Sequence, residues 1–214
     1  MKRKLKNEGG KLYDKIIQLE KTNSKRSFQF HSFFQLSFPL ISLWYNIRMD
    51  SQVKTTSAIR EMAKDIKGPI TANSLVRMRD LMYSRIAIRP YDSSTRGHEK
   101  EIRWKRTAGD ILEDGYVYSG KACTDLVILF ISLCRATGLE TNFVKVTNGE
   151  MVHSIAEVRL DDGWYIFDVS RKEAVPVKGL ITAESPYKGW RLWKKGRDAW
   201  DLGLVDFESI AKIS

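Results

Sequence analysis

Residues 123–137 read CTDLVILFISLCRAT and decide the fold that we expect for this chain. The middle of the run is apolar throughout, so periodicity alone leaves both a buried strand and a buried helix open. Its length and its ends favour a helix, because Asp125 lies in the first turn, Arg135 lies in the last turn and Gly138 can end it. We therefore expect a buried central helix that begins at Cys123.

Three segments downstream of this helix have the composition of strands. They are residues 141–146, 153–160 and 164–169, which are rich in β-branched and aromatic side chains. Residues 161–163 read Asp-Asp-Gly, a hairpin turn between the last two strands. Helices followed by strands predict an α+β domain in which an antiparallel meander packs on the central helix.

The upstream part of the domain has helical patterns broken by turn residues. We expect helices near residues 51–66 and 73–85, with Asn73 as the N-cap of the second. A Gly-Pro pair separates the two helices. Residues 89–100 are polar and predict a loop, and residues 107–112 predict a helical turn.

Positive charge is concentrated at the N-terminal end of the chain. The 214 residues include 36 Lys and Arg against 26 Asp and Glu, a formal net charge of +10. Residues 1–48 hold ten of these basic residues and three of the acidic ones, which leaves +3 for the other 166 residues. We predict that residues 1–48 form a basic and aromatic, poorly ordered extension, and that residues 49–214 form one domain.

Residues 28–47 are rich in aromatic side chains and raise the question of membrane contact. Polar residues and Pro39 interrupt the segment, and it begins too far along the chain for an ordinary signal peptide. Three interpretations stay open: a disordered or mistranslated extension, a segment that packs on the domain, and contact with lipid. We expect a cytoplasmic protein, with membrane association through residues 28–47 as the alternative.

The counts of cysteine and histidine limit the chemistry. Two cysteines and three histidines cannot build a disulfide-stapled scaffold or a four-cysteine zinc module. We expect no metal and no cofactor. Because His31 lies in the N-terminal extension and His98 in a polar loop, His153 is the histidine of the predicted core.

A thiol, an imidazole and a carboxylate can meet at the start of the central helix. The helix dipole and the unpaired N–H groups at a helix start favour the thiolate of Cys123. His153, on a neighbouring strand, can take the thiol proton, and Asp168, on the next strand, can orient the imidazole. Cys134 lies eleven residues along the same helix and is expected to be a core residue.

The register of the hairpin decides whether the imidazole and the carboxylate meet. If residues 161–162 alone form the loop, Asp168 falls opposite Ile155 and on the same face of the sheet as His153. A bulge at the turn would place Asp168 on the other face.

Two stretches of this sequence resemble the transglutaminase-like superfamily of papain-type thiol enzymes, in particular its small microbial-type members. They are SGKACTDLVILFISLCRATGLETNFVKV at residues 119–146 and VHSIAEVRLDDGWYIFDVS at residues 152–170. The shared pattern is a Gly-preceded Cys that opens a hydrophobic helix ending in R-A-x-G, then a His that opens a strand, then W-x-x-x-D. The resemblance covers about residues 107–170.

The resemblance implies both a fold and an activity. The fold is an α+β papain-like core with the cysteine helix against an antiparallel sheet. Cys123 corresponds to the nucleophile, His153 to the general base and Asp168 to the orienting acid, which implies acyl transfer on amide bonds of a protein or peptide substrate through a thioester. A cysteine peptidase, a deamidase and a transglutaminase all fit. The sequence contains no acidic calcium cluster and no paired CxxC motif, so neither of the subgroups defined by those features is indicated.

Two other functions stay open. One is a non-catalytic binding module of the same fold. The other is a nucleic-acid-binding protein that uses the basic extension and residues 187–203, where Trp190, Trp193 and Trp200 alternate with Lys and Arg. These rings can instead pack on the domain or line a substrate cleft. Trp104 has two interpretations as well: core packing, or an indole that donates to an oxyanion.

Overall fold

The structure is a computed structural model that describes residues 51–212. The predictions made for residues 1–48, including the segment 28–47, lie outside the described residues. The helices are α3 (Ser57–Ala63), α4 (Ala72–Arg85), α5 (Arg96–Ile102), α6 (Ala108–Asp114), α7 (Cys123–Ala136) and the 3₁₀ helix η1 (Phe207–Lys212). The strands are β1 (Ala87–Arg89), β2 (Tyr116–Tyr118), β3 (Thr141–Thr147), β4 (Val152–Leu160), β5 (Gly163–Phe167), β6 (Val177–Lys178) and β7 (Arg191–Gly196).

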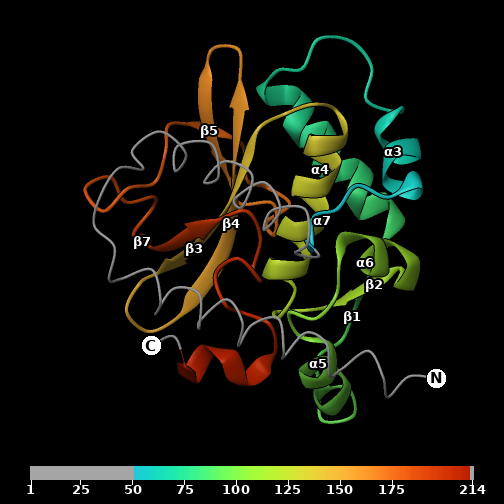
Figure 1. The fold of residues 1–214 in the computed structure, drawn as a ribbon, viewed down its shortest axis with the longest axis vertical. Helices are drawn as coiled ribbons and strands as arrows, with labels where there is room; N and C mark the ends of the chain where they lie inside the picture. The colour runs from blue at the N-terminus through green and yellow to red at the C-terminus, as the bar shows by residue number, and fades with distance from the viewer. Residues whose placement is uncertain (1–50, 213–214) are drawn as a thin grey trace, which may run out of the picture. The chain divides into compact units, whose positions relative to one another are not determined.

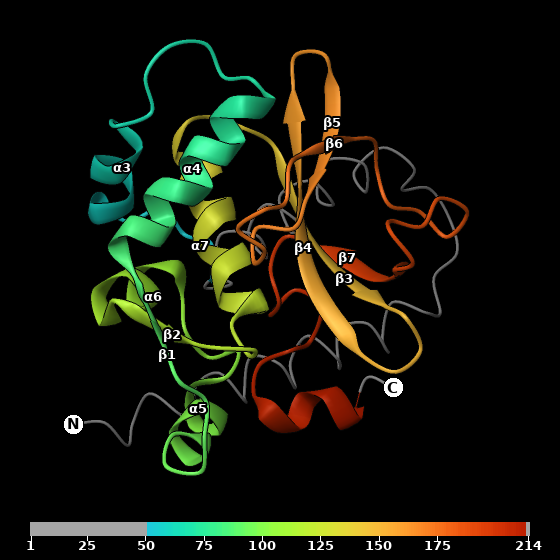
Figure 2. The same cartoon turned by 180° about the vertical axis from the view of Figure 1, so that it is seen from behind.

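Helices and sheet form two layers with α7 between them. The five-stranded sheet has the order β6-β5-β4-β3-β7, and all its neighbours are antiparallel. Helices α3, α4 and α6 pack on one side of α7, and strands β3 and β4 pack on the other (Figures 1 and 2). The fold is therefore the α+β arrangement predicted from the order of helices and strands.

Helix α7 supplies the centre of the core. Its residues from Leu126 to Cys134 are all buried, which explains why no amphipathic period is visible in this stretch. The helix stops as predicted: Gly138 has a φ of +87°, and the N–H of Leu139 donates to the carbonyl of Cys134 at 3.1 Å. Each fully buried Leu, Ile or Phe contributes roughly 1.5–3 kcal/mol of hydrophobic stabilisation, so α7 anchors the fold.

The β4–β5 hairpin has the register that the two-residue loop predicts. Leu160 pairs with Gly163 and Ala156 pairs with Phe167, with no bulge between them. Asp168 follows directly after the last residue of β5. The hairpin thus holds Asp168 next to the start of β4, where His153 lies.

The second face of the sheet is covered by the chain between β6 and β7. Ile181, Tyr187 and Trp190 pack there against side chains of β3, β4 and β5. Strand β7 then joins the sheet as an edge strand beside β3. The aromatic C-terminal segment is therefore largely a packing element of the domain, with one strand that the sequence analysis did not predict.

Three features of the chain upstream of α7 differ from those predicted from the sequence. The N-cap of α4 is Thr71, whose N–H donates to Ser74 Oγ at 3.1 Å, and Asn73 lies inside the first turn. Part of the expected loop forms α5, where buried Glu99 pairs with Arg103 four residues later. Strands β1 and β2 form a separate parallel pair of three residues each, too short for an alternating pattern to show in the sequence.

Within residues 51–212, no helix is both long and apolar enough to cross a membrane.

Candidate active site

Cys123 is the first residue of α7 and lies at an uncovered edge of strand β4. Strand β5 ends opposite Ala156, so His153 and Ser154 extend beyond the last β4–β5 pair. The imidazole of His153 and the backbone N–H of Ser154 lie near the Cys123 thiol and stabilise its negative charge, and Cys123 and His153 line the same groove. The early end of β5 therefore creates the space in which the helix start meets the strand.

The imidazole and the carboxylate are in direct contact. His153 Nε2 lies 3.0 Å from Asp168 Oδ2, and the two side chains are 16% and 5% exposed. The ring of Trp190 packs on the imidazole, with 5.3 Å between the ring centroids. The structure therefore brings together all three residues singled out in the sequence: Cys123, His153 and Asp168.

Two residues that the sequence analysis missed hold the carboxylate in place. Ser170 Oγ donates to Asp168 Oδ1 at 2.7 Å, and the Ser170 N–H reaches the same oxygen at 3.3 Å. Arg171 Nε lies 3.3 Å from Asp168 Oδ2. The spacing Asp-x-Ser is typical of a side-chain turn, and that was the available signal.

The charges of the site favour an ion pair between thiol and imidazole. Burial opposes a charge on Cys123, but the hydrogen bond with His153, the positive charge of Lys145 and the Ser154 N–H lower its pKa from 9.0 to about 6. Burial also disfavours charged His153, but the hydrogen bonds with Asp168 and Cys123 raise its pKa from 6.5 to about 9. Between these values the site holds a thiolate and an imidazolium.

The carboxylate stays ionised under the same conditions. Burial alone would raise the pKa of Asp168, but the hydrogen bonds and charges of His153, Ser170 and Arg171 lower it below the usual value. An ionised Asp168 accepts a hydrogen bond from Nε2–H of His153, and this fixes the orientation of the ring.

Cys134 is a contrasting thiol on the same helix. It is fully buried, and its sulfur lies 3.8 Å from Met78 Sδ. Burial raises its pKa, and the positive charge of Arg135 offsets only part of the cost of a buried thiolate. Cys134 is therefore a packing residue.

A polar cluster lies directly behind the nucleophile. Thr124 Oγ1 is 3.3 Å from the indole nitrogen of Trp104, 3.2 Å from Lys145 Nζ and 2.9 Å from Ser154 Oγ. Because the indole and the ammonium can only donate, the Thr124 hydroxyl must direct its own proton to Ser154 Oγ. The Trp104 side chain is buried and its N–H is used by this cluster, so it packs in the core and does not face an oxyanion at Cys123.

The three C-terminal tryptophans have separate environments. Trp190 covers His153. The indole of Trp200 donates to the carbonyl of Trp104 at 2.6 Å, and Trp193 is half-buried on β7. The three rings therefore do not form one stacking platform, and Trp190 is the one that reaches the site.

A groove of about 420 Å³ opens over the thiol. Apolar side chains contribute much of its wall, and the basic side chains of Arg171 and Lys172 also line it. Its lining residues are Tyr83, Ile88, Ser119, Gly120, Ala122, Cys123, Leu126, Met151, Val152, His153, Ser170, Arg171, Lys172 and Trp190. The groove therefore gives access to both Cys123 and His153.

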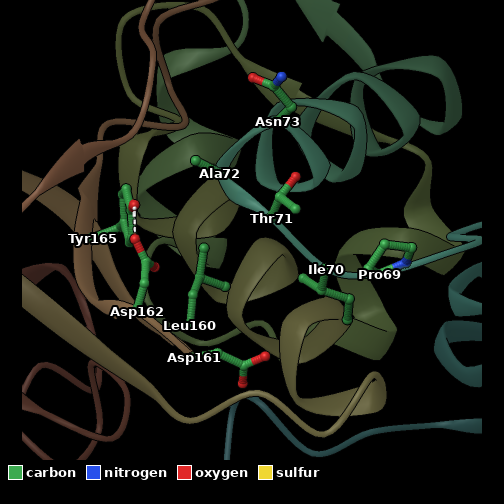
Figure 3. A pocket seen from close by; sticks show the side chains of 9 residues that line it. All are labelled: Pro69, Ile70, Thr71, Ala72, Asn73, Leu160, Asp161, Asp162 and Tyr165. Carbon is green, nitrogen blue, oxygen red and sulfur yellow. Dashed lines mark hydrogen bonds between the residues drawn. The ribbon is translucent and has the colours of Figure 1, made fainter.

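A second hollow lies between the start of α4 and the β4–β5 turn (Figure 3). Its wall carries the carboxylates of Asp161 and Asp162, and the second of these accepts a hydrogen bond from Tyr165 at 2.8 Å. Neither Cys nor His is among the described residues that line it, so it holds none of the groups that make up the thiol site.

The described part of the chain contains no cluster of side chains that could bind a metal ion. Within residues 51–212, no group of three His, Cys, Asp or Glu side chains is arranged to hold a metal ion. His98 lies on α5, where its Nε2 is 2.8 Å from the hydroxyl of Tyr116.

Comparison with known proteins identifies the family. The model of the transglutaminase-like superfamily matches residues 60–169, which is about half of the chain. The chain therefore belongs to the transglutaminase-like superfamily, as the sequence motifs predicted. The match includes Cys123, His153 and Asp168.

Two solved structures are similar to this chain at low sequence identity. A candidate cysteine protease from Cytophaga hutchinsonii matches with a TM-score of 0.47 and 18% identity over 74% of this chain and 51% of its own. LapG from Legionella pneumophila matches with a TM-score of 0.45 and 14% identity over 77% of this chain and 85% of its own. The chain thus spans about half the length of the first of these two structures. Among curated proteins, no sequence matches the chain significantly.

Proposed function

We propose that this protein is a thiol enzyme that transfers an acyl group from an amide bond of a protein or peptide. The observation that carries the proposal is that Cys123 and His153 line one open groove, and that Asp168 is hydrogen-bonded to His153 behind them. Cys123 is the nucleophile, His153 is the acid and base, and Asp168 orients the imidazole.

In the first half of the reaction the Cys123 thiolate attacks the amide carbonyl carbon. A C–S bond forms and the carbonyl electron pair moves to oxygen. When that pair returns, the C–N bond breaks, and the imidazolium of His153 gives its proton to the leaving amine. Because Nε2 is held by Asp168, Nδ1 is the ring nitrogen that serves this proton transfer. The product is a thioester on Cys123 and a neutral imidazole.

In the second half the neutral imidazole takes a proton from an incoming nucleophile. Water as that nucleophile gives a carboxylic acid, which is peptidase or deamidase chemistry, and a primary amine gives a new amide, which is transglutaminase chemistry. The C–S bond breaks, and the Cys123 thiolate and the His153 imidazolium are restored.

The helix start supports the anionic intermediate. As the first residue of α7, Cys123 has a backbone N–H without an acceptor inside the helix. This N–H and the dipole of α7 both favour negative charge beside the thiol. We propose the Cys123 N–H as one oxyanion donor.

The test is a reaction of the full chain with a glutamine-containing protein and a labelled primary amine, followed by mass analysis of both. Incorporation of the label indicates transamidation, a gain in mass of the glutamine protein corresponding to deamidation indicates hydrolysis of side-chain amides, and shortened products indicate peptidase activity. All three reactions should disappear in Cys123→Ala and persist in Cys134→Ala, which removes the other thiol of the same helix.

Two results would contradict the proposal. One is an activity that survives in Cys123→Ala. The other is the absence of all three products, and of any thioester trapped on Cys123, across a panel of protein substrates. The second result would favour the binding module of the same fold.

A further inference from the structure

Lys145 is a buried cation that the proposed mechanism leaves without a role. Its side chain is 2% exposed, although lysine is among the residues that are almost never fully buried without a partner. On β3 it follows Phe143 by two residues and shares the face that packs on α7, while Val144 and Val146 face the opposite core. An ammonium group therefore lies between the sheet and the start of α7.

The Lys145 ammonium group is hydrogen-bonded to the residue that directly follows Cys123. Nζ donates to Thr124 Oγ1 at 3.2 Å and lies 5.4 Å from the centre of the Trp104 ring. Thr124 directly follows Cys123 in the first turn of α7. Both neighbours are uncharged, and within residues 51–212 no carboxylate lies at ion-pair distance from Lys145 Nζ.

Lys195 shows how this sheet neutralises a partly buried lysine elsewhere. On the other face, its Nζ lies 2.7 Å from Glu157 Oε1 and 3.0 Å from the carbonyl of Ile181. An uncompensated buried charge is costly, so a lysine is retained in an apolar position only where another charge offsets its burial. Burial lowers the pKa of Lys145, and the anion that opposes this shift is the thiolate of Cys123. Each of the two groups stabilises the charged form of the other.

We propose that Lys145 is the fixed countercharge of the Cys123 thiolate. It is a positioning residue that acts from the core side of the site, opposite His153, and the inference rests on the proposed thiol chemistry. The two residues then have separate roles: His153 moves the proton, and Lys145 stabilises the thiolate before it attacks the amide and again when the C–S bond breaks.

Several other charged groups around the site are paired with one another. Arg103, which lies near Lys145, is bound to Glu99. Asp125, in the first turn of α7, is bound to Arg106, and Asp168 is bound to His153 and Arg171. Among the described residues, His153 and Lys145 are the cations that act directly on the sulfur.

The experiment measures the rate of iodoacetamide alkylation of Cys123 against pH in the full chain. In Lys145→Met, which keeps the length of the side chain and removes its charge, the midpoint of the rate profile should rise by about one pH unit. At pH values below the wild-type midpoint the variant should therefore react about tenfold more slowly. Lys145→Arg should restore most of the rate because it keeps the charge.

Lys195→Met is the matched control. It removes a partly buried lysine from the same sheet and leaves Glu157 unpaired, so it should lower stability without moving the alkylation midpoint. If loss of a buried side chain were enough to raise the alkylation midpoint, the midpoint would rise in both variants. That result would overturn the proposal. So would an unchanged midpoint in folded Lys145→Met.

Failure of this inference is distinguishable from failure of the proposed function. A low wild-type midpoint that Lys145→Met does not move refutes the countercharge and leaves the thiol enzyme intact. A midpoint that moves as expected in a protein without acyl-transfer activity supports the countercharge and contradicts the enzyme. A wild-type midpoint at the ordinary value for cysteine contradicts both.

A second measurement needs no substitution in the core. The Lys145 ammonium can be titrated by NMR in the native protein and after alkylation of Cys123, which replaces the thiolate by a neutral thioether. Because coupling between two sites is reciprocal, the pKa of Lys145 should fall when the thiolate is removed. An unchanged pKa would overturn the proposal even if Lys145→Met does not fold.

Discussion

At the scale of single residues, the two thiols of α7 are the most direct probe of the site. Cys123 and Cys134 share one helix, yet their surroundings move their pKa values in opposite directions. The thiolate is the reactive form, so a lowered pKa moves the alkylation profile to lower pH. Iodoacetamide should label Cys123 with a midpoint near pH 6, three units below the ordinary value of 9.0.

Cys134 should stay unlabelled over the same range and react only after denaturation. Peptide mapping of the alkylated chain distinguishes the two positions. Equal rates at the two thiols in the folded protein would show that His153 and Lys145 do not stabilise the Cys123 thiolate.

Asp168→Asn tests the orientation of the imidazole. The amide keeps the size of the side chain but removes the charge that stabilises the imidazolium and fixes the Nε2–H. We expect kcat to fall by about 10²- to 10⁴-fold, with a much smaller change in KM, because the loss occurs mainly in the transition state. Asp162→Asn is the control: this carboxylate on the same hairpin is exposed and bonds Tyr165 and Lys178, so kcat should not change.

At the scale of the elements, α7 both builds the core and carries the proposed nucleophile at its first residue. Phe130, on its buried face, is fully inaccessible and contacts the ring of Phe167 edge to face, with 5.5 Å between centroids. Phe130→Ala should lower the free energy of unfolding by about 3–5 kcal/mol, since it leaves a cavity between helix and sheet. Val205→Ala, at a half-exposed position, should change it by less than about 0.5 kcal/mol.

Denaturant unfolding of the two variants measures this difference. A small effect of Phe130→Ala would mean that the layer between α7 and β5 contributes little to stability, contrary to the packing described above.

The sequence predicts the elements whose signal is local. Asp125, Arg135 and Gly138 predict where α7 begins and ends. The two-residue loop at 161–162 predicts the β4–β5 register, which places Asp168 on the same face of the sheet as His153. Strand β7 depends on pairing with β3, more than forty residues upstream, and no local pattern encodes that contact. The sequence also does not predict the role proposed for Lys145, because a single lysine among β-branched residues does not indicate which face of the strand is buried.

At the scale of the whole molecule, the core cluster around α7 extends, among the described residues, from residue 53 to residue 204. A chain that begins at Met49 should therefore unfold cooperatively with an unchanged Tm, because it keeps every described member of this cluster. Thermal unfolding of the full and shortened chains checks this. A clear drop in Tm would show that residues 1–48 belong to the domain and would correct the boundary predicted from the sequence.

The concentration of positive charge in residues 1–48 allows a second comparison of the full and shortened chains, in their binding to nucleic acid. Residues 1–48 carry +7 of the net +10. Retention of the full chain on immobilised nucleic acid should therefore weaken steeply with salt, and the shortened chain should be retained much less. If the two chains elute at the same salt concentration, the basic extension does not mediate binding to polyanions.

The place of Cys123 on α7 also has a consequence for dynamics. Many functional sites lie on loops that open locally while the rest of the protein stays folded. Here the reactive sulfur belongs to the helix that contacts α3, α4, α6, β3 and β4, so its backbone cannot move far unless the core opens with it. Hydrogen exchange of the Leu126 amide, which donates to the carbonyl of Ala122 near the start of α7, should then approach the rate of global unfolding. Heat inactivation and loss of structure should follow one curve.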